Sequence, residues 1–241
     1  MDAKKIEAAF HQRFPDSILT IDSHVGGEPA RLVLGGLPSI PGQTVNDKRV
    51  YLSQHLDELR LRLTREPRGH RDMLASILTR PENAEAAFGL VYMDPRRYPY
   101  LCGHATIAAV SAMIELGLID AQLPETEVMV DTPSGAWRTT ARVREGGVSG
   151  RDDVRRRGPG STGLVVDSVA IRPEVAFAYL LDQTIDVPGL GRIQVDVSFT
   201  GGFFLMVSID QVGLDLTVDN APRLAQLGMD IMEAGNAQLS V

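Results

Sequence analysis

The sequence predicts a mixed α/β fold, because segments with strand patterning alternate with segments of helical patterning along its 241 residues. Residues 191–199, GRIQVDVSF, alternate polar and apolar side chains as a half-buried strand does. Residues 105–116 are apolar almost all round, which is typical of a helix buried in a core. With 44% hydrophobic residues and 23 glycines, the chain can bury one large core or two smaller ones.

The first strands are expected near the N-terminus. Residues 18–25 and 30–34 are two β-rich runs separated by Gly26, Gly27 and Pro29. Glycine and proline punctuate strands at turns, so this stretch predicts a hairpin or a tight crossover.

A helix and two further strands lead to the buried helix. Residues 46–63 begin with cap-like Asn and Asp and space their apolar side chains as one amphipathic helix does. Residues 66–70, EPRGH, end it, and we interpret them as a turn anchored by salt bridges of Glu66, Arg68 and His70. Residues 73–79 and 87–93 have strand patterning.

The second half contains the strand at 191–199 and one more helix. Residues 220–235 begin with a cap-like Asn and a first-turn Pro, and Gly235 is expected to stop the helix. Residues 237–241 then predict the start of another strand. The charged, glycine-rich residues 144–163 are expected to form a flexible, solvated loop.

The composition limits the classes of partner that the protein can bind. A net charge of -7 and a pI near 5.2 argue against a nucleic-acid partner and favour a small molecule. A single cysteine excludes an internal disulfide, and neither a signal peptide nor an apolar run of the ~20 residues needed to span a bilayer is recognisable. We therefore expect a cytoplasmic protein without a membrane partner.

No cofactor or metal is expected. The five histidines lack metal-ligand spacing, and dinucleotide and P-loop motifs are absent from the sequence. Pyridoxal chemistry needs a Schiff-base lysine, and the only lysines are Lys4, Lys5 and Lys48.

Cys102 directly precedes the apolar helix and supports two interpretations. At a helix start, backbone N–H groups and the helix dipole favour thiolate, which predicts a lowered pKa and a reactive thiol. The N–H groups of Gly103 and His104 would then bind a carboxylate beside it. Alternatively, Cys102 is core filler, since free cysteine is among the most buried residue types.

Three motifs resemble the proline racemase family, which includes 4-hydroxyproline epimerases and trans-3-hydroxyproline dehydratases. They are LCGHATIAAVSAMIELGLI at 101–119, IDSHVGGEPARLV at 21–33 and EPRGHRDM at 66–73. The likeness continues through LDQTIDVPGLGRIQVDVSFTGGFF, with residues 144–163 looking like an insertion. His24 and Glu28 lie in the second motif, and a place near the site and a role in the hairpin are equally open for both.

The resemblance implies a diaminopimelate epimerase-like fold of two pseudo-symmetric halves, each with strands around a central helix and substrate between them. The first half would be residues 1–122 and the second residues 123–241, the latter incomplete and lacking its central helix. Cys102 matches one of two residues that face opposite sides of the substrate Cα. Gly103 and His104 match the carboxylate-binding pair, and the family implies no cofactor.

The second catalytic segment of the family, Asp-Arg-x-Pro followed by Cys, Ser or Thr, does not occur in these 241 residues. The sequence therefore looks truncated before it, and strand 191–199 is expected to be left under-covered at Val195, Val197 and Phe199.

The expected function is that of a cofactor-independent proline racemase or hydroxyproline 2-epimerase. Whether the truncated sequence is inactive is left open. A trans-3-hydroxy-L-proline dehydratase and an inert amino-acid-binding or assembly protein are the alternatives, and a homodimer is left open.

Overall fold

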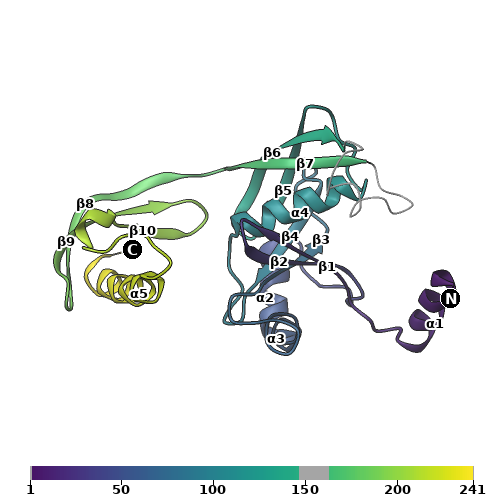
Figure 1. The fold of residues 1–241 in the computed structure, drawn as a ribbon, viewed down its shortest axis with the longest axis horizontal. Helices are drawn as coiled ribbons and strands as arrows, with labels where there is room; N and C mark the ends of the chain where they lie inside the picture. The colour runs from purple at the N-terminus through teal and green to yellow at the C-terminus, as the bar shows by residue number, and fades with distance from the viewer. Residues whose placement is uncertain (1, 147–162, 241) are drawn as a thin grey trace. The chain divides into compact units, whose positions relative to one another are not determined.

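A seven-stranded sheet organises the larger of two compact units, Met1–Glu174 and Val175–Val241. The computed structural model describes residues 2–146 and 163–240 (Figure 1). The strands lie in sequence order, with parallel pairing at β2–β3 and β4–β5 and antiparallel pairing elsewhere. They are β1 (Leu19–Val25), β2 (Glu28–Gly35), β3 (Leu74–Thr79), β4 (Phe88–Met93), β5 (Glu125–Thr132), β6 (Gly135–Glu145) and β7 (Leu164–Pro173).

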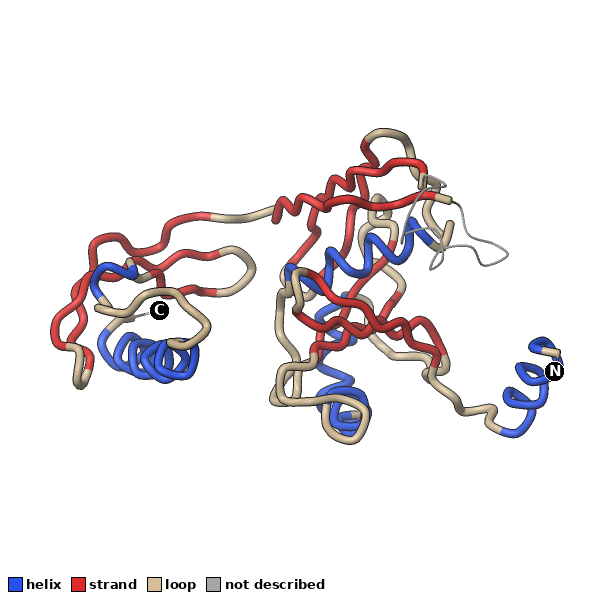
Figure 2. Tube along the Cα trace, viewed as in Figure 1, coloured by secondary structure: helices blue, strands red, loops and turns tan. Residues whose placement is uncertain are grey.

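Helices cover both faces of this sheet (Figure 2). α4 (Gly103–Glu115) lies in the core on one face, and α2 (Val45–His55) and α3 (Asp57–Thr64) pack on the other. The N-terminal helix α1 (Ala3–Arg13) belongs to neither of these core clusters. Successive side chains of a strand point to opposite faces, so Leu90 and Tyr92 of β4 join the cluster around α4, whereas Val91 and Met93 join the cluster under α2 and α3. All six residues of β4 are therefore buried, and α4 runs through the larger core.

The predicted hairpin and the strands at 73–79 and 87–93 are confirmed as β1–β2, β3 and β4. The single helix expected over 46–63 is wrong, because the chain bends at Leu56 (φ −134°, ψ 28°) between α2 and α3. Leu52 of α2 and Leu63 of α3 still lie in one apolar cluster. The bend lets one apolar stripe follow different strands, since α2 packs on β4 and α3 on β3.

The smaller unit packs one helix on a three-stranded antiparallel sheet of order β10–β9–β8. Its elements are β8 (Phe177–Val187), β9 (Gly191–Phe199), β10 (Phe203–Met206), the short 3₁₀ helix η1 (Ile209–Gln211) and α5 (Ala221–Gln238). Ile231 and Ala234 of α5 lie in one cluster with Val195 of β9. Val195 and Val197 are each 2% exposed, so the expectation that they are under-covered is wrong, whereas Phe199 is half-buried.

The end of α5 also differs from the expectation. The helix passes Gly235 and ends at Gln238, where a strand was expected to begin. A Cβ at Gly235 would lie 2.9 Å from Cδ2 of Leu205, so this glycine permits close packing of α5 on β10 and does not end the helix.

The compact units divide after Glu174, whereas the predicted halves divide after residue 122, because β5, β6 and β7 pair into the first sheet. Compactness and descent from a repeated half are different properties, so the two pseudo-symmetric halves stay a prediction. The loop expected over 144–163 falls largely on residues 147–162, which lie outside the described residues. Within the described ranges, no helix is long and apolar enough to cross a membrane.

Candidate active site

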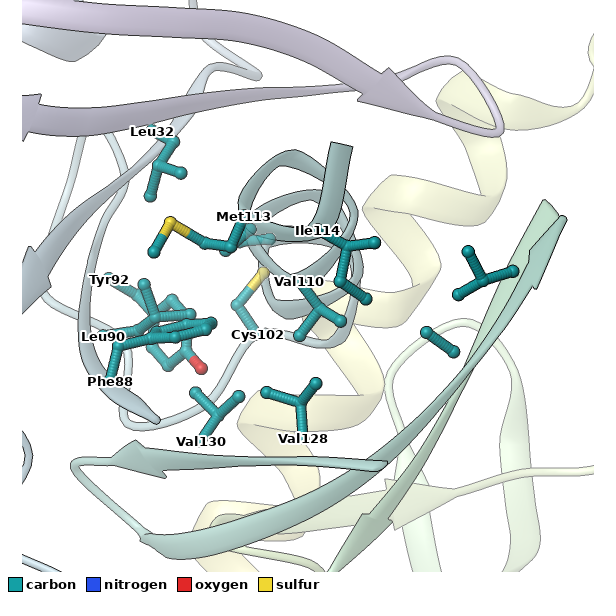
Figure 3. Packing of buried hydrophobic residues seen from close by; sticks show 14 residues of the cluster. Leu32, Phe88, Leu90, Tyr92, Cys102, Val110, Met113, Ile114, Val128 and Val130 are labelled. Atoms are coloured by element: carbon teal, nitrogen blue, oxygen red, sulfur yellow. The ribbon is translucent and has the colours of Figure 1, made fainter. Parts of the chain in front are cut away.

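Cys102 occupies the N-cap of α4, with extended backbone (φ −157°, ψ 109°), and Gly103 begins the helix. The predicted buried helix is thereby confirmed, with its start two residues earlier than expected. Figure 3 shows the Cys102 side chain among the apolar residues that surround α4. The residue is 7% exposed, so the thiol lies at the edge of the core.

A buried hydrogen-bond chain fixes the start of α4. The Thr106 hydroxyl donates to the carbonyl of Cys102 at 2.8 Å, and the Thr106 amide donates to the same oxygen at 3.1 Å. The Tyr92 and Thr106 hydroxyls are 2.7 Å apart, and because the Thr106 hydrogen is already used, Tyr92 donates. Thr106 thus connects strand β4, through Tyr92, to the backbone of Cys102.

The thiol of Cys102 contacts the ring of His104. Its Sγ lies 3.4 Å from Nδ1 and 4.0 Å from Nε2 of that ring. The His104 side chain is half-buried, so it bridges the enclosed sulfur and the surface. A thiol and an imidazole at this distance can exchange a proton.

Burial raises the pKa of the Cys102 thiol to about 11, because the thiolate loses its hydration. The backbone N–H groups of Ala105 and His104 oppose this shift, and the carboxylates of Asp94 and Glu28 add to it. The expected lowering of the pKa by the helix start is therefore wrong. The helix effect is present, but desolvation exceeds it.

Gly103 has no side chain, and the protein around it does not demand a glycine. A Cβ built there would have Ile171 Cδ1 at 3.8 Å as its nearest neighbour, which is ordinary van der Waals contact. Its φ also lies outside the left-handed region that favours glycine. A methyl group would therefore fit beside the first turn of α4, and N–H groups in a first turn have no partner inside the helix.

Glu28 and His24 differ in their relation to Cys102. The charge of Glu28, at the start of β2, acts on the thiol. His24 is exposed on β1 and pairs across the hairpin with Pro29. The structure therefore links Glu28, and not His24, electrostatically to the thiol.

Residues 66–70 form a turn as predicted, but its anchors are mainly hydrogen bonds to carbonyls. Arg31 of β2 donates to the carbonyls of Leu63 and Arg68, each at 2.8 Å, and forms a bidentate ion pair with Asp22. The guanidinium of Arg68 donates to the carbonyl of Arg62 at 3.0 Å.

Sequence reasoning missed Tyr92, Thr106 and Asp94 as neighbours of the thiol. Thr106 stands four residues after Cys102, where a threonine can donate back to a helix carbonyl, so the spacing contains a usable signal. Tyr92 and Asp94 are brought in by β4, which local patterning does not reveal. Across residues 2–146 and 163–240, no three His, Cys, Asp or Glu side chains gather as a metal site would require.

Comparison with known proteins agrees with the fold. The model of a family described as proline racemase matches residues 20–241. The proline racemase of Clostridioides difficile is 35% identical over 229 residues, which are 95% of this chain and 63% of that protein. The trans-L-3-hydroxyproline dehydratase of Xenopus tropicalis is 36% identical over 222 residues, which are 92% of this chain and 59% of that protein.

A crystal structure of a hydroxyproline epimerase from Agrobacterium vitis, with bound trans-4-hydroxy-L-proline, has a TM-score of 0.79 to this chain. It is 29% identical, and the match covers 93% of this chain and 61% of that one. The chain thus spans less than two thirds of the length of these relatives. The mixed α/β fold is confirmed, and because the family model extends over nearly all of the chain, the chain belongs to the proline racemase family.

Proposed function

We propose that this chain performs cofactor-independent proton transfer at the α-carbon of proline or hydroxyproline, with Cys102 as one acid/base group. The observation that carries the proposal is the contact between the Cys102 thiol and His104 at the first turn of α4. Racemase or 2-epimerase activity is proposed because the matching family is described as proline racemase and a similar solved structure is that of a hydroxyproline epimerase. Cys102 then serves one face of Cα.

The substrate carboxylate binds at the backbone N–H groups of Gly103 and His104. Helix N-termini bind anions through such N–H groups and the dipole, and Gly103 lets a ligand come close to the backbone because it has no side chain. A carboxylate held there brings the adjacent Cα next to the sulfur. Binding also covers the first turn of α4, which excludes water from the reacting atoms.

Proton transfer by Cys102 follows from its protonation state. With the pKa raised to about 11, the resting group at neutral pH is the thiol, which is the form that delivers a proton to a carbanion at Cα. Delivery leaves a thiolate, which the N–H group of Ala105 stabilises while that of His104 holds the carboxylate. In the opposite direction the imidazole of His104 takes the thiol proton, and the resulting thiolate removes the proton from Cα.

A dehydratase remains the second candidate, because the trans-L-3-hydroxyproline dehydratase of Xenopus tropicalis is as similar in sequence as the racemase. There the same thiolate would remove the α-proton and a 3-hydroxyl would leave. An inert binding protein of the same descent is the third candidate.

Incubation with L-proline, trans-4-hydroxy-L-proline and trans-3-hydroxy-L-proline separates these candidates. Exchange of the α-proton or a change of configuration supports proton transfer at Cα, and a keto acid formed only from the 3-hydroxy substrate supports the dehydratase. Calorimetric binding of proline with neither exchange nor product would contradict the proposed activity and favour the inert protein.

A further inference from the structure

The segment 94–101 connects β4 to α4 and ends directly before Cys102. Three arginines of the α2–α3 region donate to its backbone carbonyls. Arg60 donates to Asp94 at 3.2 Å, Arg65 to Pro95 at 2.7 and 3.1 Å, and Arg49 to Tyr98 at 3.4 Å. We call these three side chains the arginine clamp. It holds three carbonyls among the eight residues that precede the thiol.

Of the three arginines, Arg49 binds the part of segment 94–101 that is nearest to Cys102 in sequence. Its guanidinium carbon is 4.0 Å from the centroid of the Tyr100 ring, and Nη2 donates to the Tyr100 hydroxyl at 3.0 Å. Nε donates to Asn46 Oδ1 at 2.9 Å, which fixes the guanidinium to the start of α2. Arg49 therefore binds both Tyr98 and Tyr100, and only Leu101 separates Tyr100 from Cys102.

Arg60 is the buried member of the clamp, with 6% of its surface exposed. It forms a bidentate ion pair with Asp57, at 2.7 and 2.8 Å, and lies 5.7 Å from the Tyr98 ring centroid. Burying a guanidinium is costly unless it is paired and hydrogen-bonded. Its pairing with Asp57 leaves Nη1 directed at the Asp94 carbonyl, so the position of segment 94–101 is set by a rigid group.

We propose that Arg49 and Arg60 are positioning residues for Cys102, which hold segment 94–101 so that the thiol stays enclosed and in contact with His104. The inference rests on the proposed function, in which Cys102 is the reacting group. A guanidinium fork fixes the direction of the carbonyls it binds, which apolar packing alone does not do. Loosening the clamp exposes the sulfur and separates it from the His104 ring.

The expected effect has opposite signs for reactivity and for turnover. An exposed thiol regains its hydration, so its pKa falls towards the ordinary value near 9 and alkylation at neutral pH becomes faster. Turnover becomes slower, because the proton donor is misplaced. The ionisable groups that act on or contact the thiol are His104 on α4, Asp94 in the segment, Glu28 on β2 and the Tyr92 phenol on β4.

The test compares the iodoacetamide alkylation rate of Arg49→Met and Arg49→Lys with that of the native sequence, from neutral pH upwards. The matched control is Arg62→Met, since Arg62 on α3 is an exposed arginine paired with Glu58. Arg49→Met is expected to react about tenfold faster at neutral pH, as a fall of one pKa unit gives tenfold more thiolate. The alkylation rate of Arg49→Lys is expected to lie between those of Arg49→Met and the native sequence. The rate of Arg62→Met is expected to lie within about twofold of the native rate.

Global destabilisation is separated from positioning by a second measurement, the same rates in low, non-denaturing urea. Reaction through the folded state is nearly independent of urea, whereas reaction through unfolding rises steeply with it. An unchanged pH profile in Arg49→Met, or an increase that appears only through unfolding, would overturn the positioning role. Neither readout needs turnover, so a failure of the positioning role is distinguished from a failure of the proposed function, which α-proton exchange tests separately.

Discussion

The sulfur of Cys102 lies 3.4 Å from Nδ1 of His104 at the first turn of a helix that is buried in the larger core. The contact joins a group that burial keeps protonated to a group at the surface that can receive the proton. Segment 94–101 and the Tyr92–Thr106 chain hold the cysteine from two sides.

The thiol should be slow to react at neutral pH. Because its pKa is raised to about 11, the thiolate fraction is about a hundredfold smaller than that of a thiol at the ordinary value near 9. Iodoacetamide labelling followed by mass spectrometry gives the pH profile, and Cys102→Ala supplies the blank, as this is the single cysteine. A profile with its midpoint below the ordinary value would show that the helix start outweighs desolvation.

Stability should depend on pH through Cys102. A thiol with a raised pKa in the folded state contributes stability that is fully present below the unfolded value near 9 and is lost as pH rises to about 11. The free energy of unfolding of the native sequence should therefore fall relative to Cys102→Ala across this interval, by roughly 2 kcal/mol. Urea titrations at both pH values measure it, and parallel pH dependence in the two proteins would refute the raised pKa.

Loss of the buried hydrogen bond between Tyr92 and Thr106 should lower the free energy of unfolding more than loss of an ordinary helix hydroxyl. Thr106→Val removes the acceptor of the Tyr92 hydroxyl, and an unpaired buried hydroxyl costs about 1–3 kcal/mol. Adding Tyr92→Phe to Thr106→Val should recover part of this loss. Ser111→Ala is the matched control, because Ser111 makes the same bond to a carbonyl four residues earlier but is only half-buried.

Chemical denaturation measures these variants. Equal losses of stability in Thr106→Val and Ser111→Ala, with no recovery in the double variant, would mean that the Tyr92–Thr106 bond does not support the start of α4.

Gly103→Ala should separate binding from folding. The protein leaves room for the Cβ, so the free energy of unfolding should stay within about 1 kcal/mol of the native sequence. Binding of pyrrole-2-carboxylate, a planar analogue of the deprotonated intermediate, should weaken because the methyl group occupies the ligand's approach to the N–H groups.

Gly89→Ala is the opposite control, since its Cβ would meet Thr79 Oγ1 at 2.7 Å and should destabilise the fold. Calorimetric titration measures affinity, and undiminished affinity in a stable Gly103→Ala would remove Gly103 from the carboxylate site.

The elements that the sequence predicted well are those whose pattern is local. The apolar run after Cys102 predicted α4, and the alternation in 191–199 predicted β9 with the same bounds. The break at Leu56 escaped prediction because the apolar stripe continues across it and only the strands beneath require a bend. Local sequence predicts a helix end at Gly235, whereas the role of this glycine is set by Leu205, thirty residues earlier in the chain.

The position of the site was predictable from the sequence, but the burial and pKa of its thiol were not. A cysteine before a buried helix indicated where the thiol lies, but its depth depends on β4 and on the segment 94–101, which tertiary packing arranges. The helix start lowers a thiol pKa and burial raises it, so the balance depends on exposure that local sequence does not encode. The arginine clamp was missed for the same reason, since 30 to 49 residues separate its members from the carbonyls they bind.

The central claim is that Cys102 transfers a proton at the substrate α-carbon, and the most direct measurement is deuterium incorporation in deuterium oxide. A polypeptide of these 241 residues, its Cys102→Ala variant and a blank are incubated with L-proline and with D-proline, and deuterium content and configuration are followed together. A thiol at a fixed helix end reaches one face of Cα, so deuterium should enter the α-carbon of at least one enantiomer with the native sequence and not in the blank. Loss of the exchange in Cys102→Ala completes the predicted result, whereas exchange that persists in that variant, or no exchange at all under conditions where proline binds, would contradict it.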